Sequence, residues 1–276
     1  MQQTIEGEKL MHFIRYLLFI TIISLALGLA SCKSHENTNV IKLGVMEGPE
    51  ANEWEVAKKI ALTRYGLQIK LIKFTDYTLP NEALNNGDID ANAFQHVPFL
   101  NAQIKARGYK IIPVANTFLN PIVMYSHKIT QLSQLKIGDM IGIPNDPSNE
   151  ARALLLLQKG NLIKLRSKVG VNATPIDIIS NPKQLKFVEL PAAQLPRALK
   201  DVTAAIITNN FASAADLDPH QGLLIEDAHS PYMNVIVIRT KDKDKQSIRQ
   251  MIKAFQTPEV ITIAKKVSNG NIVVGW

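Results

Sequence analysis

The fold class follows from one stretch, IKLGVMEGPEANEWEVAKKIALTRYGLQIKLIKF, which occupies residues 41–74. Residues 41–45 are a short apolar run of the kind that forms a buried strand. Residues 51–65 place apolar side chains at helical spacing, and Gly66 stands where a helix C-cap is expected. Residues 68–74 alternate polar and apolar side chains, which predicts a second strand. The stretch therefore predicts a strand–helix–strand unit.

The same alternation continues along the rest of the chain. Further helices are predicted over residues 79–86, 98–107, 148–159, 194–200, 243–255 and 258–267. Further strands are predicted over residues 88–93, 109–115, 121–126, 140–143, 186–190, 204–207 and 235–239. Alternation of this kind predicts an α/β protein with parallel sheets and helices on both faces of each sheet. Because the pattern restarts after Ser126, we expect two α/β domains.

The N-terminal part of the chain has the order of a secretory signal. Lys9 and Arg15 precede an apolar run over residues 16–30, and the run closes on Leu-Ala-Ser-Cys at residues 29–32. The run is shorter than the roughly 20 apolar residues that a membrane-spanning helix needs. The closing motif resembles the lipobox of bacterial lipoproteins, which implies that Cys32 is acylated and anchors the chain to a membrane. The alternative is a cleaved signal followed by an incidental cysteine. We therefore predict a signal peptide over residues 1–31 and a polar tether over residues 32–39.

The composition is that of an ordinary globular protein. The 276 residues are 46% hydrophobic and 20% charged, and the net charge is +7. The basic residues are spread along the chain without interleaved aromatic residues, and an exported protein has no DNA partner, so we expect no nucleic-acid binding. Two explanations of the positive charge remain open: attraction to an anionic bilayer surface, and an unspecialised solvated surface.

Signatures of catalysis are missing from the sequence. The six histidines are scattered and lack zinc-site spacing, and there is no Gly-x-Ser-x-Gly elbow, phosphate-binding loop or dinucleotide fingerprint. Catalysis by a pair of carboxylates stays open, although no Asp or Glu pair stands out. We therefore expect a protein that is not an enzyme and that holds no metal or cofactor.

Polar and aromatic residues instead gather at the carboxyl ends of predicted strands, where open α/β sheets bind ligands. These residues are Tyr77, Phe94 and His96 within residues 92–96, Asn116, and Asn149 within residues 145–149. Arg152 follows in the first turn of the next helix, where its guanidinium could bind a carboxylate bidentately. The alternative for Arg152 is a solvated position on the surface of the helix.

Several of these segments carry a family resemblance. Residues 81–96 (NEALNNGDIDANAFQH), 144–149 (PNDPSN), 152–158 (RALLLLQ) and 230–234 (SPYMN), with the closing Asn-Gly at 269–270 and Gly-Trp at 275–276, resemble the methionine-binding lipoproteins of ABC importers, the NlpA lipoprotein family. The resemblance covers essentially the whole mature chain.

The resemblance implies a two-domain periplasmic-binding-protein fold with methionine in the cleft between the domains. Domain 1 would comprise residues 40–127 and 230–276, and domain 2 residues 128–229, with hinges near residues 126–130 and 227–232. The partners would be a membrane permease with a cytoplasmic ATPase pair and the lipid bilayer. The protein would be a monomer, lipid-anchored in the bacterial cell envelope and facing the periplasm.

The resemblance also assigns roles to single residues. Arg152 would bind the ligand carboxylate with Asn149 close by, and Asn234 would bind the α-amino and α-carboxyl end. Tyr77, Phe94 and His96 would form the wall for the thioether side chain, a contact that favours sulfur against aromatic rings. Asn116 completes the candidate ligand-binding set.

The chain departs from the family pattern at two places. Residues 207–211 are Ile-Thr-Asn-Asn-Phe where Ile-Asn-x-Asn-Tyr is common, so either Thr208 or Asn209 would contact the ligand. Phe99 stands where a tyrosine is usual. Two alternative functions follow: a binding lipoprotein for another amino acid or a dipeptide, and a surface interaction lipoprotein without a role in transport.

Overall fold

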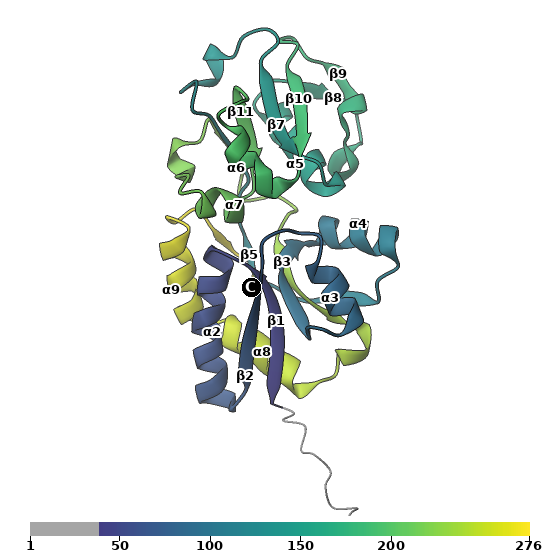
Figure 1. Ribbon diagram of the computed structural model, residues 1–276, viewed down its shortest axis with the longest axis vertical. Coiled ribbons are helices and arrows are strands. Elements are labelled where there is room, and N and C mark those ends of the chain that lie inside the picture. The colour runs from purple at the N-terminus through teal and green to yellow at the C-terminus, as the bar shows by residue number, and fades with distance from the viewer. Residues whose placement is uncertain (1–38) are drawn as a thin grey trace, which may run out of the picture. The chain divides into compact units, whose positions relative to one another are not determined.

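The computed structural model describes residues 39–276, so the predicted signal peptide, Cys32 and most of the tether lie outside the described residues. Two five-stranded sheets organise this part of the chain (Figure 1). The first has the order β2 (Gln68–Phe74), β1 (Val40–Met46), β3 (Ala91–His96), β13 (Asn234–Arg239) and β4 (Ile111–Asn116). The second has the order β10 (Lys186–Leu190), β7 (Met140–Pro144), β11 (Ala204–Ile207), β6 (Val123–Tyr125) and β12 (Leu224–Ile225).

Helices and two small ribbons complete the structure. The helices are α2 (Pro49–Tyr65), α3 (Pro80–Asn86), α4 (Val97–Arg107), α5 (Pro147–Lys159), α6 (Leu195–Ala198), α7 (Asn209–Ala214), α8 (Gln246–Phe255) and α9 (Pro258–Val267). β5 (Phe118–Leu119) pairs with β14 (Val273–Val274), and β8 (Lys164–Leu165) pairs with β9 (Ile178–Ser180). Within residues 39–276, no helix combines the length and the hydropathy that spanning a bilayer requires.

The strand–helix–strand unit predicted from residues 41–74 is confirmed. β1 and β2 pair in parallel over their whole length, from Val40 opposite Gln68 to Met46 opposite Phe74. α2 connects them and ends at Gly66, whose φ of 60° is the left-handed conformation that glycine adopts without steric cost. The local pattern was sufficient here because all three elements are consecutive in the chain.

The first sheet is buried on both faces, as alternation along β13 shows. Ile236 and Ile238 pack in one core with Trp54 of α2 and Phe255 of α8. Val235 and Val237, which point to the other face, pack with side chains of α3 and α4. In Figure 1, α2 and α8 lie on one side of this sheet and α3 and α4 on the other. A continuous apolar run such as β13 is therefore explained by helices on both faces.

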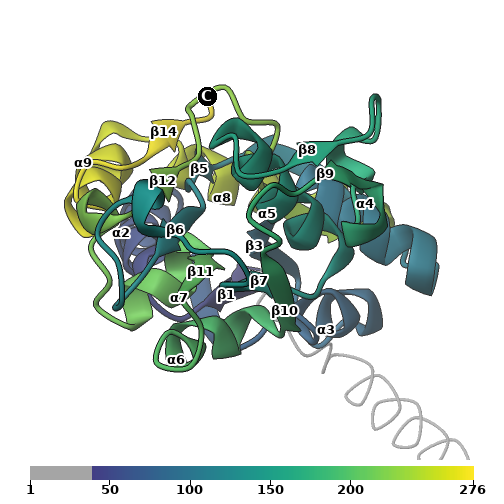
Figure 2. The same ribbon diagram turned by 90° about the horizontal axis from the view of Figure 1, so that it is seen from above.

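The second sheet has the same layered construction. Ile141 and Ile143 of β7 pack with α5 on one face, whereas Ala205 and Ile207 of β11 pack with α6 on the other. Figure 2 shows α5 and α6 on opposite sides of these strands. Gly142 allows the close approach of α6, because a Cβ there would lie 3.1 Å from a methyl carbon of Leu195 and 3.2 Å from Cβ of Ala205.

Both sheets are mixed, so the prediction of parallel sheets was wrong in this respect. β13 runs antiparallel to β3 and β4, and β6 runs antiparallel to β11 and β12. The reason is the path of the chain. Each of these two strands enters its sheet directly from the other domain, without the helical crossover that would turn it parallel to its neighbours.

The position of the first domain crossing also differs from the expectation. The boundary predicted at 127/128 assigned residues 121–126 to domain 1, but β6 is hydrogen-bonded in the second sheet. The first crossing therefore lies before β6, in residues 117–122, and not in residues 126–130. The second crossing lies between β12 and β13, in residues 226–233, close to its expected place. A three-residue apolar strand does not carry in its own sequence the identity of the sheet that receives it.

A buried amide network connects α3 to β3. Asn81, Asn92 and Gln95 are at most 2% exposed. The Asn81 amide nitrogen donates to Oε1 of Gln95 at 2.8 Å, and the Asn92 amide nitrogen donates to Oδ1 of Asn81 at 2.9 Å. Gln95 in turn donates to Oδ1 of Asn92 at 2.9 Å. The network explains the amide residues in the 81–96 motif and holds the end of β3, where His96 follows.

We predict that Asn81→Ala destabilises the protein. The variant leaves one N–H of Asn92, one N–H of Gln95 and the Gln95 Oε1 acceptor without partners, at about 1–3 kcal/mol for each unsatisfied group. Urea denaturation followed by circular dichroism measures the free energy of unfolding. The control is Asn86→Ala on the same helix, where the side chain is exposed and a change below about 0.5 kcal/mol is expected. Equal stabilities of the two variants would contradict the structural role of the network.

Candidate functional site

A cavity lies where the carboxyl ends of strands from the two sheets meet. Eight of the nine predicted ligand-binding residues line it: Tyr77, Phe94, His96, Asn149, Arg152, Thr208, Asn209 and Asn234. Its other lining residues were not among the predicted set: Glu50, Gln95, Phe99, Asn120 and Asn210. Five of the eight predicted residues were expected from their positions at or just after strand ends, whereas Thr208, Asn209 and Asn234 were implied by the family resemblance.

Asn116 is the predicted residue that does not line this cavity. Its side chain is exposed, and its amide nitrogen donates to the carbonyl of Gly275 at 3.0 Å. Its own carbonyl accepts from the Gln256 side chain at 3.1 Å. Asn116 ends its strand at the edge of the first sheet, next to the C-terminal segment, and this edge position takes it away from the cavity. Asn116 therefore lies outside this cavity, and its assignment as a ligand-binding residue stays a prediction.

One wall of the cavity is aromatic. Tyr77 lies with its ring centroid 5.8 Å from that of Phe94 and 5.8 Å from that of Phe99, and Phe94 and Phe99 meet edge to face at 5.9 Å. Phe211 of the second domain closes against Tyr77 at 5.0 Å. Met46, at the end of β1, packs into the same cluster. Such a wall accepts an apolar or thioether chain of modest length.

His96 is a neutral imidazole that connects the two domains. Its Nδ1 accepts the backbone N–H of Phe99 at 3.2 Å, so Nε2 carries the proton and donates to Oδ1 of Asn149 at 3.1 Å. The Asn149 amide nitrogen donates to Oδ2 of Asp146 at 3.0 Å, which orients the amide with its oxygen toward His96. Burial, together with the nearby Arg152 guanidinium, lowers the pKa of His96 to about 3. His96 therefore stays uncharged across the physiological range.

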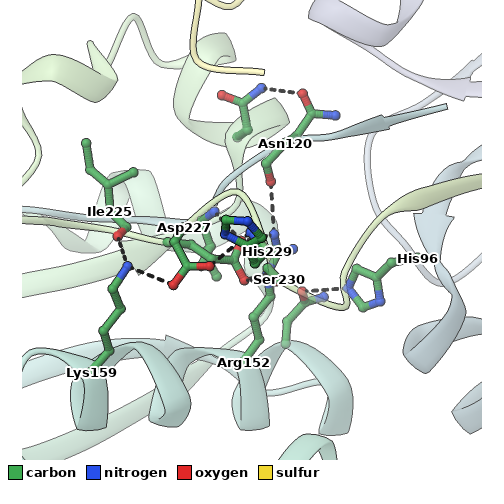
Figure 3. Close-up of polar contacts among 12 residues, drawn as sticks. His96, Asn120, Arg152, Lys159, Ile225, Asp227, His229 and Ser230 are labelled. Atoms are coloured by element: carbon green, nitrogen blue, oxygen red, sulfur yellow. Dashed lines mark hydrogen bonds and ion pairs between the residues drawn. The ribbon is translucent and has the colours of Figure 1, made fainter. Parts of the chain in front are cut away.

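Arg152 lines the cavity but is already held by protein groups (Figure 3). It is 5% exposed, its Nε donates to Oε1 of Glu226 at 2.9 Å, and its Nη2 donates to the carbonyl of Asn120 at 2.9 Å and to Oε2 of Glu226. The guanidinium also lies over the Tyr232 ring, 4.7 Å from its centroid. Within residues 39–276, no hydrogen bond uses Nη1. Arg152 is thus not a solvated surface residue, and its guanidinium is not free to bind a carboxylate bidentately. A single nitrogen, Nη1, is left for a ligand.

Glu226 joins Arg152 to both domain crossings. It lies on the second crossing, and its Oε1 accepts the Ser230 hydroxyl at 2.6 Å. Its Oε2 accepts the backbone N–H of Ile122, on the first crossing, at 3.2 Å. The backbone N–H of Glu226 donates to the carbonyl of Ile122 at 3.1 Å. The charge partner of Arg152 therefore sits where the two crossings run side by side.

The 207–211 segment contributes three consecutive residues to the cavity. The Tyr77 hydroxyl donates to Oδ1 of Asn210 at 2.5 Å and lies 2.9 Å from the hydroxyl of Thr208. Asn209 donates to Oδ1 of Asn120 at 3.3 Å. The amide nitrogen of Asn210 is buried without a hydrogen-bond partner. Thr208 is therefore occupied by Tyr77, and the free donor of this segment belongs to Asn210.

Glu50 is the second cavity residue with an unpaired buried atom. It lies in the first turn of α2 and is 7% exposed. Its Oε1 accepts the Asn234 amide nitrogen at 3.2 Å, whereas its Oε2 is buried without a hydrogen-bond partner. Burial raises the pKa of Glu50 to about 8. The strand-end rule applied to Tyr77 would also have found Glu50, since it follows the first strand.

The arrangement suits a small molecule that is apolar at one end and polar at the other. An apolar chain fits against the aromatic wall, while the other end faces a free acceptor, a free amide donor and one guanidinium nitrogen. Within residues 39–276, no group of three or more His, Cys, Asp or Glu side chains is placed to hold a metal ion.

The model of the NlpA lipoprotein family matches residues 41–276 of the chain. The D-methionine-binding lipoprotein MetQ of Salmonella typhimurium is 50% identical over 255 residues, which cover 91% of this chain and 94% of that protein.

Two solved structures are similar throughout. A periplasmic substrate-binding protein of an ABC transporter from Coxiella burnetii is 51% identical with a TM-score of 0.82, covering 85% of this chain and 99% of the other. A nutrient binding protein from Burkholderia cenocepacia, bound to methionine, is 48% identical with a TM-score of 0.83, covering 86% of this chain and 100% of the other. The family match and these identities, each extending over most of both proteins, show that this chain belongs to the NlpA lipoprotein family.

Proposed function

We propose that this chain is the substrate-binding component of an ABC importer, which captures methionine in the cavity between its two domains and delivers it to a membrane permease. One observation carries the proposal: the same cavity has an aromatic wall and, beside it, an unpaired hydrogen-bond acceptor and an unpaired hydrogen-bond donor. The methionine-bound relative from Burkholderia cenocepacia supports the same assignment.

The ligand would lie with its two ends in different surroundings. Its thioether chain would rest against Tyr77, Phe94 and His96, where sulfur–ring contacts contribute roughly 0.3–1.5 kcal/mol each. Its carboxylate would meet Nη1 of Arg152, with Asn149 nearby, and Asn234 would lie at the α-carbon end. Because both domains supply these groups, binding favours the closed arrangement of the domains.

Outside the described residues, Cys32 would carry the lipid that keeps the protein at the bacterial cell envelope, facing the periplasm. A permease with a cytoplasmic ATPase pair would receive the ligand, and the binding protein would act as a monomer without catalytic activity. The lipobox-like sequence at residues 29–32 and the lipoprotein relatives support the anchor.

Titration calorimetry of L-methionine tests the function directly. Protein stripped of carried-over ligand by unfolding and refolding should bind L-methionine one to one with sub-micromolar affinity. A circular dichroism spectrum matching that of unstripped protein serves as the folding control. Refolded protein that gave neither heat nor thermal stabilisation would refute methionine as the ligand. Other amino acids, dipeptides and a role without transport would then be tested.

We predict that Arg152→Ala abolishes tight binding and also destabilises the protein. The variant leaves the buried Glu226 carboxylate unpaired, and breaking a buried ion pair by removing one partner costs about 3–5 kcal/mol. The double variant Arg152→Met with Glu226→Gln removes both charges, so it should regain stability without regaining affinity. Urea denaturation and calorimetry measure the two quantities separately.

The control for this prediction is Lys159→Ala on the same helix. Lys159 pairs with Asp227 at 3.1 Å, but both side chains are about half exposed, and such pairs contribute at most about 1 kcal/mol. Wild-type affinity in the stable double variant would contradict a role for Arg152 in ligand binding.

A further inference from the structure

Two buried carboxyl groups lie on the first two turns of α2. Glu50 and Glu53 are 7% and 2% exposed, and each has one oxygen that is buried without a hydrogen-bond partner. Only Glu50 lines the cavity. Unpaired carboxyl oxygens are costly to bury, because they exchange hydration for an apolar surrounding. Glu50 and Glu53 lie on the same helix and are both buried. Because Glu53 does not line the cavity, it is a matched control that separates a ligand-binding role of Glu50 from a structural one.

The charges around Glu50 do not neutralise it. Glu53, on the same helix, is also acidic, and its proximity disfavours a second negative charge. Tyr77 and His96 line the same cavity as uncharged groups. Arg152 is the cationic side chain of the cavity lining, but its charge is balanced by Glu226. The cavity therefore presents an acidic group for which the described residues supply no cation.

A cationic group on the ligand would supply this missing partner. Oε1 of Glu50 accepts the Asn234 amide nitrogen, and the Met46 backbone N–H also lies near the carboxyl group and lowers its pKa. Oε2 has no hydrogen-bond partner among the described residues and is left for the ligand. The free amide nitrogen of Asn210 is a donor and suits the opposite, anionic end. An acceptor and a donor left unpaired in one cavity are the pattern that a zwitterion satisfies.

We propose that Oε2 of Glu50 receives the α-ammonium group of the ligand, which makes Glu50 the residue that selects for a free amino group. This inference rests on the proposed function and adds to it a specificity determinant. Molecules that keep the carboxylate and the thioether chain but lack the amino group are rejected, because they leave the Glu50 oxygen buried and unpaired.

Ligand binding should release a proton from Glu50. Because burial raises the pKa of Glu50 to about 8, the unliganded group is mostly protonated at pH 7. The ammonium group favours the carboxylate, so Glu50 releases its proton to solvent as the ligand enters. Calorimetry in buffers of different ionisation enthalpy should show the release of close to one proton for each ligand bound.

The experiment compares Glu50→Gln and Glu53→Gln with the parent protein, using L-methionine and 4-(methylsulfanyl)butanoic acid as ligands. The parent and Glu53→Gln should prefer methionine by about 100-fold or more, as expected for a buried charge with or without its partner. Glu50→Gln should lose most of this preference, and its binding should release no proton. A Glu50→Gln variant that kept both the preference and the proton release would overturn the inference while leaving the methionine assignment intact. A parent protein that bound no methionine would instead refute the proposed function together with this inference.

Thermal unfolding in the absence of ligand tests whether Glu50→Gln still folds. The folded-state pKa of Glu50, about 8, lies above its ordinary value of 4.5. The contribution of this group to stability is therefore fully present below about pH 4.5 and is lost as the pH rises toward 8. Glu50→Gln lacks this loss, so its melting temperature at pH 8 should equal or exceed that of the parent. A melting temperature well below that of the parent would indicate that the carboxylate is a structural group and would also overturn the inference.

Discussion

The ion pair between Arg152 and Glu226 is the interaction on which the binding region depends. Arg152 is 5% exposed, and a guanidinium that is so deeply buried requires a charge partner. Glu226 provides that partner from the second domain crossing and also accepts the backbone N–H of Ile122 on the first. The helix that lines the cavity and the two segments that connect the domains are thus held at one point. Movement of either crossing would disturb a buried charge.

Apart from Glu50, the rest of the cavity is built from groups that stay neutral. His96 keeps a single proton because of its contact with the Phe99 backbone and its burial, and Tyr77 uses its hydroxyl on Thr208 and Asn210. Amide side chains supply most of the remaining polar surface. Such groups are oriented by their neighbours before a ligand arrives, so that little reorganisation is needed on binding. The cost of burying charge is concentrated at the Arg152–Glu226 pair and at Glu50.

Local patterns were enough to predict most of the individual elements. β2, β10, β11 and α9 have the predicted bounds, because period-2 alternation, apolar runs and a proline at the helix start act over a few neighbouring residues. Direction and membership within the sheets were not predictable in this way. β13 and β6 are antiparallel to their neighbours because the chain passes from one domain to the other immediately before each of them. Very short pairings such as β5 with β14 carry too few residues to show a period.

The sequence by itself determined the α/β class, the two-domain organisation and eight of the residues that line the cavity, since strand ends and family motifs are properties of consecutive residues. Only the tertiary structure decided which of these residues are free to bind. Arg152 meets Glu226 across a separation of 74 residues, and Tyr77 meets Thr208 across 131. Glu50 and Asn210 became candidates because each is buried with one atom unpaired. Hydrogen-bond partners are settled by distance in space, and a linear sequence does not contain those distances.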